Sequence, residues 1–192
     1  MSEVANRIQI SGPDENFIFH TILNGGNDID FNNIIPIPPD VYMGDITQEA
    51  LHKYGERNWF DWCQRNWSVK TNPTTYESIP DKKIIFFTTE WNTPFKIWEK
   101  ISKQFPTTEI RVMYSNSYGD KNEYLIYKNG SSTKNDIKDE FSFFAYVWGF
   151  TDEEKFIKKI QKGDLGNITD DEKRNLIKNM RIFLKENASI LY

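Results

Sequence analysis

The sequence predicts an α+β fold in which helices pack on a mainly antiparallel sheet. The segment 82–106 combines an apolar run rich in β-branched and aromatic residues, a corner and an amphipathic helix. A second strand and helix follow one another within residues 6–26. Two alternating segments, 109–114 and 122–128, are joined by the polar connection typical of a β-hairpin.

The segment 82–106 is the central unit, in which residues 84–87 form a buried strand. A helix begins after the corner at residues 91–94, where Thr93 can cap the helix and Pro94 suits its first position. Pro106 disfavours a helical conformation at the residue before it and so ends the helix. The apolar residues of this helix recur at helical spacing: Ile97, Trp98, Ile101 and Phe105.

The N-terminal part alternates between strand, helix and proline-rich chain. Residues 6–11 alternate apolar and polar side chains, which predicts a half-buried strand. Asp14 can cap a helix that ends at the glycine pair 25–26. The prolines within 31–43 favour an extended segment on the surface of the core, and an inserted helix is expected at about 47–66.

The C-terminal part begins with a polar, charged segment at 131–139 that we expect to be loose. Residues 141–148 form an apolar run that is interpreted as a further strand. Capping boxes at Thr151–Glu154 and Thr169–Glu172 predict a C-terminal pair of helices. The expected units are an α+β domain at residues 1–150 and a helical extension at 151–192.

Composition restricts the classes of function. The formal net charge of −4 argues against a general nucleic-acid binder, which needs a basic face. The single cysteine, Cys63, excludes an intramolecular disulfide and a cysteine-based metal cage, and it suits a reducing compartment. Residues 1–9 lack the features of a signal peptide, and no apolar run reaches the length of a membrane span. We therefore expect a cytoplasmic protein without membrane association.

No pattern in the sequence predicts catalytic, metal-binding or cofactor-binding residues. His20 and His52 are the only histidines, and neither has a cysteine or acidic cluster at ligand spacing. The pair 25–26 and the glycines at 163 and 166 lack the lysine and the strand–loop–helix context of a phosphate-binding loop. Cys63 next to Trp62 is typical of core packing rather than of an activated nucleophile.

One aromatic and polar cluster is a candidate binding surface. Its aromatic rings could stack on a nucleic-acid base or on a side chain of a partner, with a lysine supplying charge. The alternative is that both tryptophans pack the inserted helix onto the sheet, because aromatic residues mostly serve cores. The candidate residues are Trp67, Lys70, Asn72, Trp91 and Asn92.

Four segments of the sequence are similar to motifs of a known family. Phe31–Pro38 is similar to F-x-x-I-I-P-x-P, and Trp62–Asn72 to W-C-x-x-N-W-G-T-K-W-N. Phe87–Pro94 is similar to F-x-T-x-W-x-x-P, and Ser102–Pro106 to S-x-x-F-P. In these motifs the chain resembles a family of phage- and plasmid-encoded proteins with a YubB-type ferredoxin-like domain. The resemblance covers residues 5–130 and implies a ferredoxin-like antiparallel sheet with helices packed on one face, but no activity.

The chain departs from this family at several positions. Ser68, Val69 and Thr71 stand where glycine, threonine and tryptophan are usual, and residues 115–117 replace the usual acidic side chains. The last departure argues against a carboxylate site after the strand 109–114.

Together these observations favour a non-enzymatic, protein-binding module from a mobile genetic element. The alternative is a single-stranded nucleic-acid-binding module that uses Trp67, Lys70 and Trp91. A third hypothesis is an enzyme whose site is assembled only in three dimensions.

Overall fold

The computed structural model describes residues 3–26, 28–149 and 169–186, and it has an α+β fold. Six antiparallel strands form one sheet in the order β2-β3-β1-β4-β5-β6, which confirms the expected class and the antiparallel sheet. The strands are β1 (Glu3–Ser11), β2 (Tyr76–Ile79), β3 (Ile84–Glu90), β4 (Glu109–Asn116), β5 (Asn122–Lys128) and β6 (Ser131–Asn135). The α-helices are α1 (Glu15–Ile22), α2 (Gln48–Tyr54), α3 (Trp59–Trp67), α4 (Phe95–Gln104), α5 (Glu140–Val147) and α7 (Asp170–Glu186). Short 3₁₀ helices are η1 (Asn24–Gly26), η2 (Phe31–Asn33) and η3 (Pro80–Lys82).

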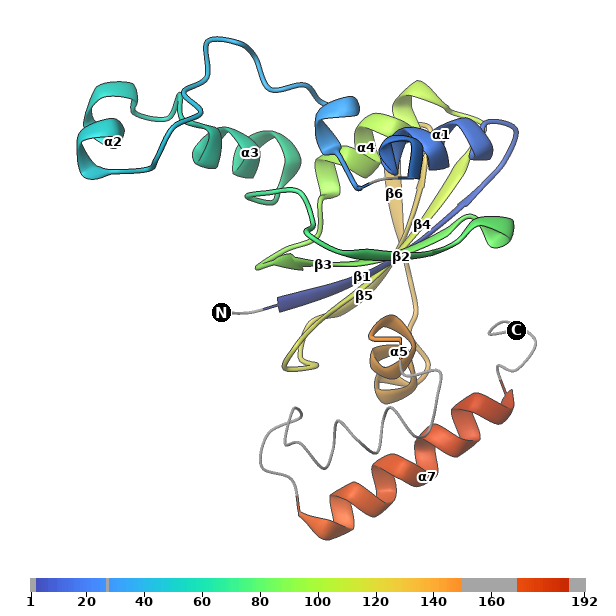
Figure 1. The fold of residues 1–192 in the computed structure, drawn as a ribbon. Coiled ribbons are helices and arrows are strands. Elements are labelled where there is room, and N and C mark those ends of the chain that lie inside the picture. Colours follow the sequence, from blue (N-terminus) through green and yellow to red (C-terminus); the bar gives the residue numbers. More distant parts are fainter. Residues whose placement is uncertain (1–2, 27, 150–168, 187–192) are drawn as a thin grey trace.

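The main core lies between one face of the sheet and the helices α1 and α4 (Figure 1). Phe31 is at its centre, although the proline-rich segment was expected to stay on the surface. Its ring centre lies 5.9 Å from Trp67, 6.2 Å from Phe87 and 6.4 Å from Trp98. Aromatic residues bury a large area each, so a few of them fill this layer.

The other face of the sheet is covered as well, by a helix that the expected packing of helices on one face did not include. Helix α5 contacts β1, β4 and β5, and α7 packs against α5 on its far side (Figure 1). A second cluster of buried side chains forms there around Ala5, Met113 and Val147. The helices and sheet therefore form more than two layers.

The expected strand at 141–148 is this helix α5. A continuous apolar run has no periodicity that separates a buried strand from a buried helix. The N–H of Phe143 donates to the carbonyl of Asp139 at 3.0 Å, as in a first helical turn. Because α5 lies between the sheet and α7, it is apolar on more than one side.

Covering the second face buries both sides of β1, which was expected to be half-buried. Arg7 is 1% exposed and lies between two rings, with its guanidinium carbon 3.5 Å from the ring centre of Tyr146 and 4.5 Å from that of Phe86. Its Nε and Nη1 atoms have no hydrogen-bond partner in the described structure. Desolvation lowers the pKa of Arg7 to about 10.

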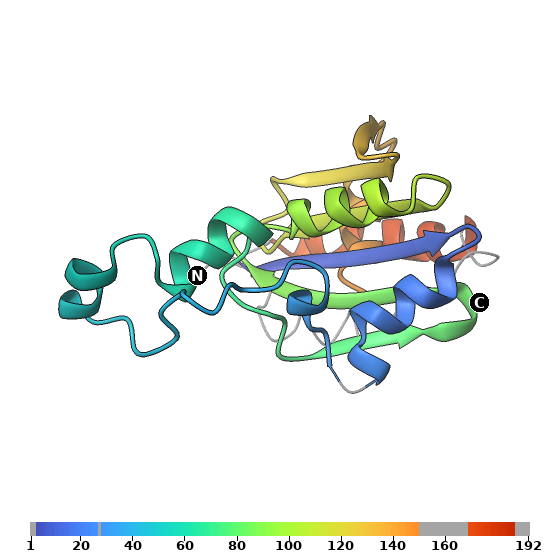
Figure 2. The ribbon, with the colours of Figure 1, turned by 90° about the horizontal axis from the view of Figure 1, so that it is seen from above.

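The inserted helix expected at about 47–66 is broken into α2 and α3. Gly55 ends α2 with a φ of 55°, which a residue with a β-carbon rarely adopts. Asn58 then caps α3 by accepting a hydrogen bond from the N–H of Asp61 at 3.0 Å. Figures 1 and 2 show that α2 lies farthest from the sheet, at the end of an arm.

The expected caps of the first and central helices are not made by the predicted side chains. Asp14 precedes α1 without a capping bond, and Glu15 instead accepts a hydrogen bond from the N–H of Gly12 at 3.2 Å. Pro94 is the N-cap residue of α4, and the buried hydroxyl of Thr93 has no partner in the described structure.

The C-terminal expectations have mixed outcomes. The segment expected to be loose contains β6, which pairs with β5. The second capping box is confirmed, because the N–H of Thr169 donates to Glu172 at 2.7 Å and the N–H of Glu172 donates to Thr169 at 3.3 Å. The first box and the expected boundary at residue 150 lie outside the described residues.

Substituting Arg7 tests how its buried charge contributes to stability. We expect Arg7→Met to keep the free energy of unfolding within about 1 kcal/mol of the parent, because it fills the same space without a desolvated charge. Arg7→Ala leaves a cavity and should lose about 2–4 kcal/mol. Urea unfolding followed by circular dichroism measures both, and equal losses in the two variants would show that the charge itself is required.

Candidate binding surface at Trp91

The corner between β3 and α4, residues 91–94, holds Trp91 in an unusual backbone conformation. Its φ is 69°, in the left-handed region. For residues with a β-carbon this region costs about 1–2 kcal/mol, and bulky side chains are seldom found there. Contacts with the surrounding structure must therefore hold Trp91 in this left-handed conformation.

A buried chain of hydrogen bonds links the corner to the centre of the sheet. The side-chain amide of Asn6 on β1 donates to the hydroxyl of Thr89 on β3 at 2.9 Å. That hydroxyl donates to the carbonyl of Asn92 at 2.5 Å, and the N–H of Asn92 donates to the carbonyl of Glu90 at 2.8 Å. Asn6 is 1% and Thr89 is 7% exposed, so water does not compete for these bonds.

The corner presents the Trp91 side chain to solvent. Trp91 is 56% exposed. The ammonium of Lys70 lies 5.3 Å from the ring centre of Trp91 and 4.7 Å from that of Phe60, which places the cation within reach of both rings. We call Phe60, Lys70 and Trp91 the Trp91 surface.

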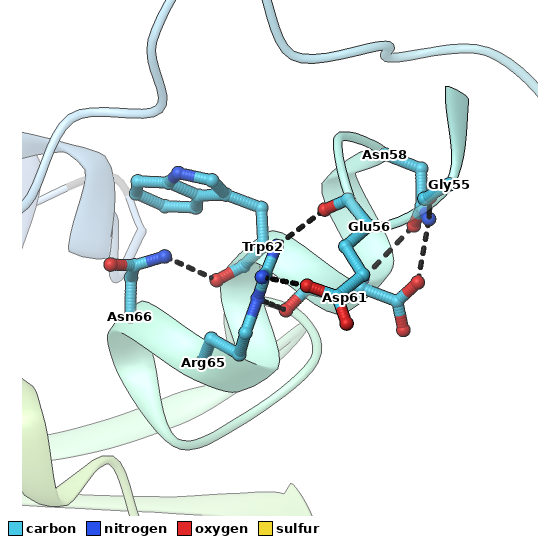
Figure 3. A network of polar contacts seen from close by, with 7 residues as sticks. All are labelled: Gly55, Glu56, Asn58, Asp61, Trp62, Arg65 and Asn66. Atoms are coloured by element: carbon cyan, nitrogen blue, oxygen red, sulfur yellow. Dashed lines mark hydrogen bonds and ion pairs between the residues drawn. The ribbon is translucent and has the colours of Figure 1, made fainter.

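Helix α3 brings Phe60 to this surface and is itself held by polar contacts (Figure 3). Asn58 donates to the carboxylate of Asp61 at 2.7 Å in addition to capping the helix. Arg65 forms an ion pair with Glu56, which ties α3 to the turn before it. On the other side, the ammonium of Lys96 on α4 donates to the carbonyl of Arg65. The Lys96 contact joins α3 to α4, the helix that follows the corner.

Trp67 and Asn72 have internal roles rather than a place on the surface. Trp67 is 3% exposed, and its indole N–H donates to the carbonyl of Ile35 at 2.8 Å. Asn72 accepts from the N–H of Phe31 and donates to the carboxylate of Asp30, both at 2.9 Å. Trp67 thus fits the packing interpretation, and its ring is not open to a ligand.

Of the five predicted residues, the structure brings Lys70 and Trp91 together at the surface. Asn92 supports the corner through its backbone. Sequence reasoning missed Phe60, for which no local signal exists, and Asn6, for which one does. Asn6 falls on the apolar face of β1 with Val4 and Ile8, where a polar residue indicates a specific partner.

The charge next to the corner is negative. Glu90 precedes Trp91, and Glu3 lies directly opposite Glu90 on the neighbouring strand. Both residues are exposed, and no ion pair between described residues involves either of them. Like charges directly opposite one another in a sheet are destabilising.

The groups of the described residues that could take part in catalysis or metal binding are the Cys63 thiol and the histidine and acidic side chains. Burial raises the pKa of Cys63 to about 12, so this thiol is protonated at neutral pH and is a poor nucleophile. Within the described ranges, no group of three or more histidine, cysteine or acidic side chains is placed to hold a metal ion. None of the helices seen in the described chain has the length and apolar character needed to cross a membrane.

Comparisons with known proteins give little further information. No family model and no curated protein matches the sequence. Among solved structures, the chain is similar to protein api92 of the DUF1281 family from Yersinia pseudotuberculosis, with 16% sequence identity and a TM-score of 0.36. The match covers 43% of this chain and 32% of that one. A likeness of this size has no bearing on fold or function.

Replacing the Thr89 hydroxyl tests the hydrogen-bond chain. Thr89→Val keeps the shape of the side chain, but it leaves the Asn6 amide with the carbonyl of Val4 as its acceptor and removes the hydroxyl that donates to the carbonyl of Asn92. We expect a loss of about 1–3 kcal/mol in the free energy of unfolding, measured with urea. The matched control is Thr133→Val on the exposed part of β6, which should change stability by less than about 0.5 kcal/mol. Equal losses of stability from the two substitutions would show that the hydrogen bonds of Thr89 do not stabilise the corner.

Proposed function

We propose that this chain is a protein-binding module and that the Trp91 surface is its contact site. One observation carries the proposal: Trp91 is 56% exposed although a buried hydrogen-bond chain holds it in a strained conformation. Strained residues cluster at functional sites, where the surrounding structure maintains them. Tryptophan is also enriched among the residues that dominate the binding energy of protein interfaces.

The rigidity of the corner supports this role. A side chain fixed before binding loses less conformational freedom on association than a mobile one. The backbone of Trp91 is fixed by its bonded neighbours, and its ring has Lys70 as a neighbour. Such a ring is suited to act as an anchor in a pocket of a partner.

The charge around the surface favours a protein over a nucleic acid. Glu90 precedes Trp91 in the chain and Glu3 lies opposite Glu90; both are exposed, and they would repel a phosphate backbone that approached the corner. The buried Trp67 removes one of the two stacking platforms that the nucleic-acid hypothesis needs. Lys70 is the one cation of the Trp91 surface.

We also propose that β1, α1, β2, β3, α4 and β4 form a ferredoxin-like unit, to which β5 and β6 add at one edge. The strand order β2-β3-β1-β4 supports this, together with the succession strand–helix–strand–strand–helix–strand. The position of α1 and α4 on one face is a further argument (Figure 1). An origin in a phage or plasmid stays a prediction from the sequence resemblance.

Quantitative affinity capture tests the binding function. The immobilised full chain is incubated with an extract of the cells that express it, in parallel with the Trp91→Ala and Phe17→Ala variants. Phe17 is the matched control because it is an exposed aromatic residue on α1, away from the corner. We expect a stoichiometric protein that binds the parent and the control equally. It should bind Trp91→Ala at least about thirtyfold more weakly, as for a hot-spot residue.

Two results would contradict the proposal. One is the absence of any stoichiometric protein, and the other is a partner that binds Trp91→Ala as well as it binds the parent. The nucleic-acid alternative is tested by the fluorescence anisotropy of a labelled single-stranded oligothymidylate at low salt. Binding that is lost in Trp91→Ala and Lys70→Ala would favour that alternative instead.

A further inference from the structure

The Trp91 surface has the features of a site for a positively charged side chain. The faces of aromatic rings carry negative potential, and tryptophan attracts cations best. Within the chain, the ammonium of Lys70 already lies near the rings of Phe60 and Trp91. Because Trp91 is 56% exposed, it still offers ring surface to a partner.

The two carboxylates next to the corner supply the matching charge. Glu90 is covalently next to Trp91, and Glu3 faces Glu90 across the strand pair. Two opposed carboxylates repel each other, and the described structure pairs neither with a cation. A cation brought by a partner would relieve this repulsion and gain from both charges.

We propose that the partner is a protein segment that places an arginine against the exposed face of Trp91, where Glu90 and Glu3 pair with its charge. This inference rests on the function proposed above. Arginine fits better than lysine, because its planar guanidinium stacks on aromatic rings and can donate to carboxylates at the same time. Arginine is also enriched at protein interfaces, whereas lysine is depleted.

Short peptides of glycine and serine that carry several arginines provide the probe. Matched peptides carry lysine, the uncharged analogue citrulline, or glutamate at the same positions. The readout is the indole N–H signal of Trp91 in ¹⁵N correlation spectra of the full chain. A Trp91→Phe sample identifies this signal among those of the six tryptophans.

We expect the arginine peptide to shift the Trp91 signal saturably, the lysine peptide to bind more weakly, and the citrulline and glutamate peptides to have no effect. The double variant Glu3→Gln/Glu90→Gln should bind the arginine peptide about fivefold more weakly. Its matched control is Glu49→Gln/Glu77→Gln, which removes two exposed carboxylates elsewhere and should bind like the parent.

The inference is overturned if the arginine peptide leaves the Trp91 signal unchanged, or if both double variants weaken binding equally. It is also overturned if oligothymidylate shifts the Trp91 signal. The partner from the capture experiment separates the two proposals. If it needs Trp91 but binds Glu3→Gln/Glu90→Gln unchanged, the arginine proposal fails and the binding function stands. If it binds Trp91→Ala unchanged, both fail.

Discussion

The hydroxyl of Thr89 makes the contact on which the Trp91 surface depends. It accepts a hydrogen bond from Asn6 in the sheet and donates one to the backbone of Asn92 in the corner. Because β1 lies between β3 and β4, Asn6 belongs to one of the best-supported strands of the sheet. These hydrogen bonds hold an exposed turn in a fixed position relative to the sheet. Their free energy offsets the energetic cost of the left-handed conformation at Trp91.

Residues 67–72, from the last residue of α3 onward, hold Lys70 at the same surface. The buried side chains of Trp67 and Val69 anchor the chain after α3, and Asn72 binds the backbone at η2. Lys70 lies between these anchors, so the chain carries it to the rings of Phe60 and Trp91. The burial of Trp67 therefore helps to build the surface, although Trp67 itself does not belong to it.

The sequence predicted those elements whose patterns have a single physical meaning. The alternation at 109–114 fits a strand and nothing else, and the apolar residues at 97–105 lie on one face only of a helix. The run 141–148 has no period, so its helical state depends on the layer formed by α7, which local residues do not specify. The contact of Lys70 with Phe60 joins two segments whose relative positions are determined only by the tertiary fold. In contrast, the sequence does indicate a role for Asn6, because a polar residue on the apolar face of a strand needs a hydrogen-bond partner.

The most direct test is to compare the stability of Trp91→Gly and Trp91→Ala. Both variants remove the ring and its contact with Lys70, so they differ only in how well the residue tolerates the left-handed region. If the corner imposes that conformation, Trp91→Gly should be more stable than Trp91→Ala by about 0.5–1 kcal/mol in urea unfolding. An alanine variant as stable as the glycine variant, or more stable, would show that the corner relaxes to an ordinary conformation and that the constraint on Trp91 does not exist.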